Sequence, residues 1–131
     1  MLSVLQAFLI EAAKETGEKE VVVSDRFPAP FKIRALDIDE WERIQRLSTN
    51  PEAAGANRVS EMGVLKRCVI AGCVEPNFRD AEFIKALGVQ SADEAIKKTL
   101  RAGEIVTLAN EITKFSGYGE SVEQARKEAA N

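Results

Sequence analysis

The sequence predicts an α+β fold that is mostly α-helical, with one β-hairpin packed on a bundle of about six or seven short helices. Two runs with strand-like residues, at about residues 20–25 and 31–36, stand close together on either side of two prolines. The other segments repeat apolar residues every three or four positions between recognisable helix caps. Because a two-stranded hairpin alone is marginal in water, we expect helices to cover its apolar face.

Length and composition are typical of one soluble domain, which we expect to span residues 1–131. Hydrophobic residues make up 45% of the chain and charged residues 30%, a globular balance. The formal net charge of −3 argues against a nucleic-acid partner, because such proteins usually present a basic face. No apolar run approaches the roughly 20 residues that span a bilayer, and the N-terminus lacks a positive leader region. We therefore expect no membrane partner and a cytoplasmic location.

The first predicted helix lies within residues 1–17. Ser3 and Gln6 form a capping-box pattern at its start. A stripe of apolar residues follows at helical spacing: Leu2, Leu5, Phe8, Leu9 and Ala12. Val4 and Ile10 lie off this stripe, so the helix is apolar over more of its circumference than one core contact requires.

The hairpin is predicted within residues 18–36. Three consecutive valines mark its first strand. In the second strand apolar residues alternate with Lys32 and Arg34, the pattern of a strand with one solvated face. Pro28 and Pro30 cannot donate a hydrogen bond to a ladder, so we place them in the connection.

A helical body is predicted over residues 37–115. Its first helix has Asp37 at the N-cap, Glu40 at the capping-box position, and a hydrophobic staple between Leu36 and Trp41. The expected core stripe of this helix is Ile38, Trp41, Ile44 and Leu47.

After a loop at 48–57, the next helix is expected from near 58–60 to about Gly72, before a break centred on Pro76. Three further helices are predicted. The first is capped by Asp80 or Asn77 and ends at Gly88, and the second begins with a capping box of Ser91 and Glu94 and ends near Gly103. The third has one apolar face: Ile105, Leu108, Ala109, Ile112 and Phe115. Residues 116–131 hold few large apolar residues, which predicts a loosely attached tail.

The residue inventory argues against metal and cofactor chemistry. The chain has no histidine, the commonest metal ligand and general base. If the apolar segment that holds Cys68 and Cys73 is helical throughout, the Cα atoms of these two residues lie about 8 Å or more apart, beyond ordinary disulfide reach. We expect buried free thiols, no metal and no cofactor.

Candidate catalytic groups have simple structural roles. Asp37, Asp39 and Glu40 could serve as general acids or bases, but each is expected to cap a helix or favour its dipole. The Ser-Asp pair at 24–25 has no base of suitable pKa beside it. Arg26 could bind an anion, and a salt bridge is the simpler interpretation. These residues predict a non-enzymatic interaction protein.

Five segments, in their order, carry a family resemblance: LQAFLIEAAK, EVVVSDRF, FKIRALDIDEWERI, CVIAGCVEPNFRDAEFIKALGV and LRAGEIVTLANEITKFSGY. Over roughly residues 5–118 the chain resembles the tail assembly chaperones of long-tailed bacteriophages and prophages, the XkdN-like group. The resemblance implies a protein that binds the tape measure protein, keeps it soluble and helps recruit tail tube subunits. It also implies action in the host bacterial cytoplasm, absence from the mature virion and no catalytic residues.

Two other functions stay open at this point. One is a structural minor tail or head–tail component that is retained in the virion, and the other is a small bacterial regulatory adaptor. Self-association through an exposed strand edge also stays open.

Several apolar residues are candidates for partner binding. Leu5, Phe8 and Ile10 represent the first helix, because its apolar surface exceeds what one core contact needs. Phe27 and Phe31 flank the hairpin turn, and either packing against helices or an exposed patch would explain them. Tyr118 represents the predicted tail.

Overall fold

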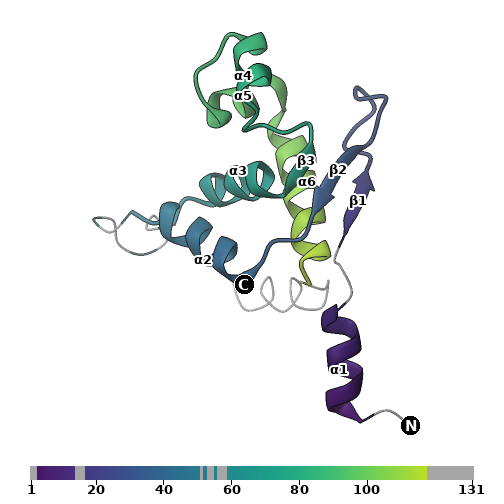
Figure 1. Cartoon of the computed structure of the whole chain (residues 1–131). Coiled ribbons are helices and arrows are strands. Elements are labelled where there is room, and N and C mark those ends of the chain that lie inside the picture. The colour runs from purple at the N-terminus through teal and green to yellow at the C-terminus, as the bar shows by residue number, and fades with distance from the viewer. Residues whose placement is uncertain (1–2, 14–16, 51, 53–54, 56–58, 118–131) are drawn as a thin grey trace.

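The computed structural model describes residues 3–13, 17–50, 52, 55 and 59–117. Within these residues six helices and a three-stranded antiparallel sheet form a mostly helical α+β fold, which confirms the predicted class (Figure 1). The elements in order are α1 Val4–Ala13, β1 Glu18–Val21, β2 Phe31–Arg34, α2 Ile38–Leu47, α3 Glu61–Gly72, β3 Cys73–Glu75, α4 Ala81–Leu87, α5 Ala92–Thr99 and α6 Ala102–Phe115.

The sheet has the order β1-β2-β3, so the predicted hairpin is joined by a third strand. In the hairpin Val21 lies opposite Phe31, and on the other side of β2 Ile33 lies opposite Cys73. The segment after Gly72 was predicted to be a break centred on Pro76, but its first residues form the strand β3. A three-residue strand that directly follows a helix is too short to show the alternating pattern of a strand.

Both predicted strands were too long at their C-terminal ends. The first was expected over 20–25 but spans 18–21, because residues 22–30 turn away from β2 and anchor on α6 through Ser24 and Arg26. The second was expected to reach residue 36 but ends at Arg34. There the chain leaves the ladder, and the Leu36 N–H donates to Ser116 Oγ at 2.8 Å.

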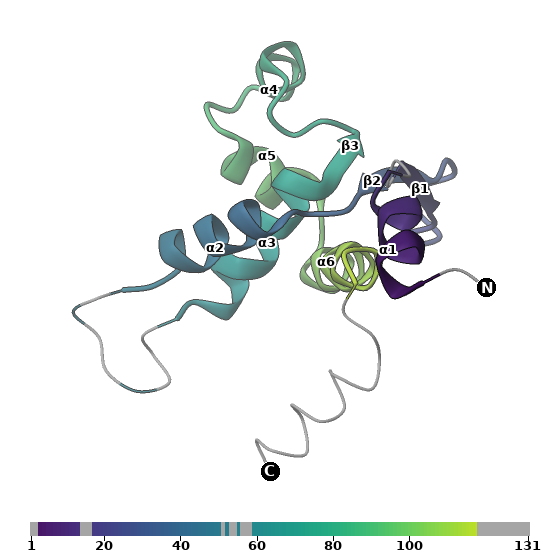
Figure 2. The ribbon, with the colours of Figure 1, turned by 60° about the horizontal axis from the view of Figure 1, so that its bottom comes forward.

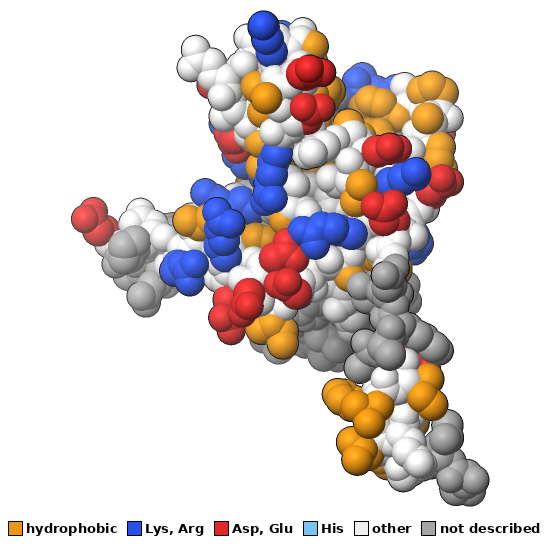
Figure 3. Space-filling model, viewed as in Figure 1, with side chains coloured by type: hydrophobic (Ala, Val, Ile, Leu, Met, Phe, Trp, Pro, Cys, Tyr) orange, Lys and Arg blue, Asp and Glu red, His pale blue; other side chains and the backbone are white. Residues whose placement is uncertain are grey.

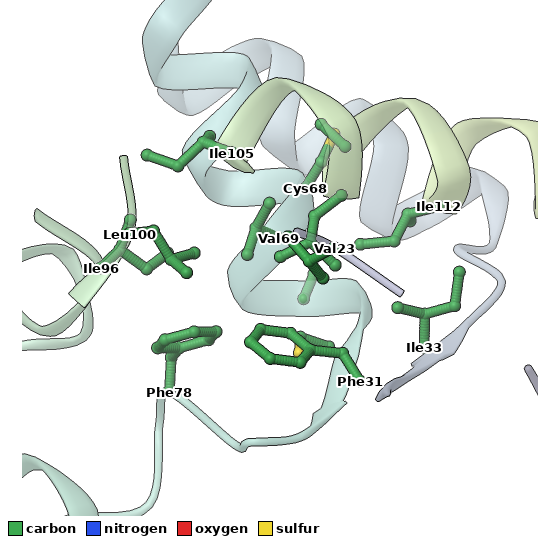
Figure 4. Packing of buried hydrophobic residues seen from close by; sticks show 14 of the residues in the cluster. Val23, Phe31, Ile33, Cys68, Val69, Phe78, Ile96, Leu100, Ile105 and Ile112 are labelled. Carbon is green, nitrogen blue, oxygen red and sulfur yellow. The ribbon is translucent and has the colours of Figure 1, made fainter. Parts of the chain in front are cut away.

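The core lies where α3 and α6 cross and face β2, and these two helices have the most extensive helix–helix contact (Figure 4). Gly72 permits this close approach, because a Cβ there would lie 2.6 Å from Ile112 Cγ2. Four residues of the predicted apolar face of α6 are buried, and Phe115 packs partly against them. The largest fully buried side chains are Phe78, Ile33, Ile96, Leu108, Ile112, Val69 and Cys68.

The start of α2 was predicted correctly, but only the middle of its predicted core stripe, Trp41 and Ile44, packs on the core. Asp37 Oδ1 accepts from the Glu40 N–H at 2.8 Å and Glu40 accepts from the Asp37 N–H, which closes the capping box. Ile44 is buried, whereas Ile38 is 76% exposed and Leu47 is 52% exposed. This helix packs chiefly on α3, and Trp41 is half-buried against the core.

Other predicted caps are present, but the helix after Ser91 was expected to end near Gly103 and instead ends at Thr99, because Gly103 already lies in the first turn of α6. Ser3 Oγ accepts from the Gln6 N–H, and the Gln6 side chain accepts from the Ser3 N–H, as in a capping box. Asp80, rather than Asn77, caps α4, which ends at Gly88 in the left-handed conformation with φ 73°. The Ser91 hydroxyl caps α5 by accepting from the Glu94 N–H.

Candidate functional site

Helix α1 is the most exposed apolar element in the described part of the chain. Every side chain described in it, from Val4 to Glu11, is exposed. The large apolar ones are Val4, Leu5, Phe8, Leu9 and Ile10, which are between 48% and 89% exposed. The helix extends away from the body in Figure 1 and comes forward in the turned view of Figure 2, and hydrophobic side chains cover much of it in Figure 3.

The described members of the apolar stripe predicted for α1, Leu5, Phe8 and Leu9, therefore do not join the core of this chain. Leu5 is 64% exposed, Phe8 65% and Leu9 56%, although a helix of this kind usually buries such a stripe. A helix of ten residues is marginally stable by itself, and apolar patches on soluble proteins commonly mark interaction sites. The arrangement is suited to binding an apolar or amphipathic partner segment.

The two phenylalanines of the hairpin are placed differently. Phe31 is 7% exposed and belongs to the core, while Phe27 is half-buried with its ring centroid 5.1 Å from that of Phe31. The guanidinium carbon of Arg26 lies 4.6 Å from the centre of the Phe27 ring. Packing within the fold accounts for both rings. The remaining candidate, Tyr118, lies outside the described residues.

A buried carboxylate anchors the hairpin connection to α6. Glu104 is 6% exposed, and Arg26 donates to both of its oxygens, from Nη2 at 2.6 Å and from Nε at 2.8 Å. Ser24 Oγ donates at 2.6 Å and the Arg101 N–H at 2.7 Å. The hydrogen bonds from Arg26 hold the pKa of Glu104 far below its ordinary value. The salt-bridge interpretation of Arg26 is confirmed.

The role of Glu104 as a buried anchor was not predicted from the sequence. Its spacing after Arg101 fits the first turn of a helix, but nothing local indicates that its partner comes from a hairpin far away in the sequence. The carboxylate at the start of α2 has a similar structural role. Arg34 donates to both oxygens of Glu40 and lowers the pKa of Glu40.

The two cysteines are free and buried, as predicted. Burial raises the pKa of the Cys68 thiol to about 11 and that of the Cys73 thiol to about 12. Near neutral pH both thiols are protonated and poor nucleophiles. Among the residues the structure describes, no cluster of three or more His, Cys, Asp or Glu side chains is arranged to hold a metal ion. Nor does the described part contain a helix with the length and apolarity to cross a membrane.

These features define a class: a small, mostly helical protein whose candidate site is an exposed apolar helix. The family model of the phage XkdN-like tail assembly chaperone protein matches residues 5–130. The chain therefore belongs to the XkdN-like tail assembly chaperone family, and the predicted resemblance is confirmed.

The fold has a counterpart among solved structures. The crystal structure of a protein called YqbN aligns with a TM-score of 0.69 at 20% sequence identity, over 91% of this chain and 100% of that chain. At this identity the likeness shows a shared fold. No curated protein matches the sequence significantly.

Proposed function

We propose that this tail assembly chaperone binds the tape measure protein of its phage and keeps it soluble while the tail tube assembles. Family membership supports a role in tail assembly. The exposed apolar surface of α1 is the observation that favours binding of a long helical client. The protein has no catalytic role in this proposal, and it acts in the host bacterial cytoplasm.

In the proposed complex, α1 lies against an apolar face of the client. Leu5, Phe8 and Ile10 point around more than one side of the helix, so the client covers surface that the chaperone's own fold leaves exposed. Burial of apolar area stabilises such a complex by roughly 25 cal/mol for each Å² removed from water. A charge placed in this surface would have to be desolvated on binding and should oppose it.

Co-expression of the chaperone with the tape measure protein of the same phage tests the placement on α1. Leu5→Asp and Phe8→Asp should each abolish co-purification and leave the tape measure insoluble. Val22→Asp is the matched control, because Val22 is 72% exposed but lies in the hairpin connection. Circular dichroism should show folded protein in all three variants. Normal co-purification by folded α1 variants would refute the placement.

Composition of the finished particle separates this function from that of a structural tail component. In mass spectrometry of purified virions we expect the tape measure and tube proteins but not this chain. Its presence at a fixed copy number would instead identify a retained minor tail or head–tail component.

A further inference from the structure

A second candidate interaction surface lies between α2 and α3. A groove of about 220 Å³ has Ile44, Leu47 and Ile70 among its apolar lining residues. Arg43, Arg67 and Arg79 line the same groove, and we call it the arginine groove. Lysine and arginine side chains gather in a band between the α4–α5 lobe and the α2–α3 pair (Figure 3). In both ribbon views this region lies away from α1 (Figures 1 and 2).

The positive charges of the groove exceed its negative ones. Its one lining carboxylate, Glu40, accepts two hydrogen bonds from Arg34, and this pairing, more than the nearby charge of Arg79, lowers the pKa of Glu40. Arg67 donates from Nη1 to the Ser48 hydroxyl at 3.0 Å, a contact that leaves its charge unpaired.

Within the described residues, none of the three groove arginines forms an ion pair with a carboxylate. Arg43 and Arg79 are also exposed, so their guanidinium groups are accessible to a partner. The surface thus combines apolar contact area with unpaired guanidinium groups, and such a surface is complementary to an acidic amphipathic segment.

We propose that the arginine groove binds an acidic amphipathic segment of a protein partner, a function beyond the client contact proposed for α1. Guanidinium groups bind carboxylates through paired, charge-assisted hydrogen bonds, while Leu47, at 52% exposed, offers apolar contact. Pockets that enclose small ligands usually measure about 300–1,000 Å³. The smaller groove fits one or two side chains of a docked helix better than a cofactor.

A protein segment fits the groove better than a nucleic acid does. The formal net charge of the chain is −3, and acidic residues Asp37, Asp39 and Glu42 lie on and before the same helix that supplies Arg43. A nucleic-acid strand needs an extended basic surface, whereas a short acidic helix needs only a few charges beside an apolar contact.

Fluorescence anisotropy with labelled designed peptides tests the proposal on the full-length protein. One probe is an amphipathic helix with leucines on one face and glutamates beside them, and the second has lysines in place of the glutamates. The glutamate peptide should bind more tightly, and its affinity should fall as salt is raised above ~0.1 M. A labelled oligothymidylate serves as the nucleic-acid probe and should not bind at this groove.

Charge removal in the groove provides the decisive comparison. Arg43→Gln combined with Arg79→Gln should weaken binding of the glutamate peptide about two- to thirty-fold, as expected for the loss of two surface ion pairs. Arg46→Gln is the matched control, because Arg46 is exposed on the same helix but does not line the groove. It should change the affinity less than about two-fold.

Three results would overturn the proposal. The first is equal or absent binding of the two peptides, and the second is an equal effect of Arg46→Gln and of the groove variant. The third is oligothymidylate binding that the groove variant weakens, which would identify a nucleic-acid site. Normal circular dichroism and thermal melting of each variant verify that changes in affinity do not come from unfolding.

Discussion

The close contact of α3 with α6 makes a quantitative prediction for Gly72. An alanine Cβ at this position would lie 2.6 Å from Cγ2, 2.8 Å from Cδ1 and 3.0 Å from Cγ1 of Ile112. Ile112 is fully buried, so it cannot move into solvent. Overpacking of a core costs about 1–3 kcal/mol, whereas replacing glycine by alanine in a helix gains up to about 1 kcal/mol. Gly72→Ala should therefore lower the free energy of unfolding by about 1–2 kcal/mol.

The contact with Ile112 also predicts that the effect of Gly72→Ala on stability changes sign when the Ile112 side chain is removed. Ile112→Ala removes all three atoms that the new Cβ would meet, at a cost of about 2–5 kcal/mol by itself. In that background Gly72→Ala should be neutral or stabilising by up to about 1 kcal/mol. Gly103 is the matched control, because it lies in α6 with no atom within 4 Å of an added Cβ.

Urea unfolding followed by circular dichroism measures all four proteins, together with Gly103→Ala, which should not be destabilised. An equal effect of Gly72→Ala in the presence and absence of the Ile112 side chain would refute the packing argument. So would a Gly72→Ala protein as stable as the original chain.

Two further predictions concern ionisable groups. The pKa of Glu104 is lower in the folded protein than its ordinary value of 4.5, so its contribution to stability is complete above about pH 4.5 and is lost as the pH falls further. At pH ~7 the free energy of unfolding of Glu104→Gln should therefore be lower than that of the original chain, as measured by urea unfolding. This difference in free energy should be smaller at pH ~3. An equal difference at both pH values would contradict the lowered pKa of Glu104. Because Cys68 and Cys73 are buried and protonated, an aromatic disulfide reagent at pH ~8 should react with both only when urea unfolds the chain. Rapid reaction of the native protein would contradict their placement.

Local signals in the sequence predicted the helix starts well. The capping boxes at Ser3 and Asp37 and the cap at Ser91 depend on residues three positions apart, so a sequence shows them directly. The buried face of α6 was also predictable, because one side of this helix packs continuously on the core.

Features that depend on distant residues were not predictable in the same way. The strand β3 forms because β2 offers it an edge, and the first strand ends early because Arg26 reaches Glu104 on α6. The periodicity of apolar residues also does not show whether a helix buries its apolar stripe in the core of the same chain or leaves it exposed. Ile44 does so, but Leu5 and Phe8 have the same kind of spacing and remain exposed.

The two candidate surfaces also differ in how far the sequence predicts them. The excess apolar surface of α1 is visible in its sequence, so Leu5, Phe8 and Ile10 can be predicted as partner-binding candidates from the sequence alone. The arginine groove combines Arg43 of α2 with residues of α3 and the segment before α4, and no short stretch of sequence contains it.

Amide hydrogen exchange of α1, measured in the free chaperone and in its complex with the tape measure protein, tests the central claim most directly. In the free protein the backbone amides of residues 4–13 should exchange quickly, because an exposed ten-residue helix opens easily. In the complex these amides should become strongly protected. Unchanged exchange in α1, with new protection elsewhere, would contradict the claim that this helix binds the client.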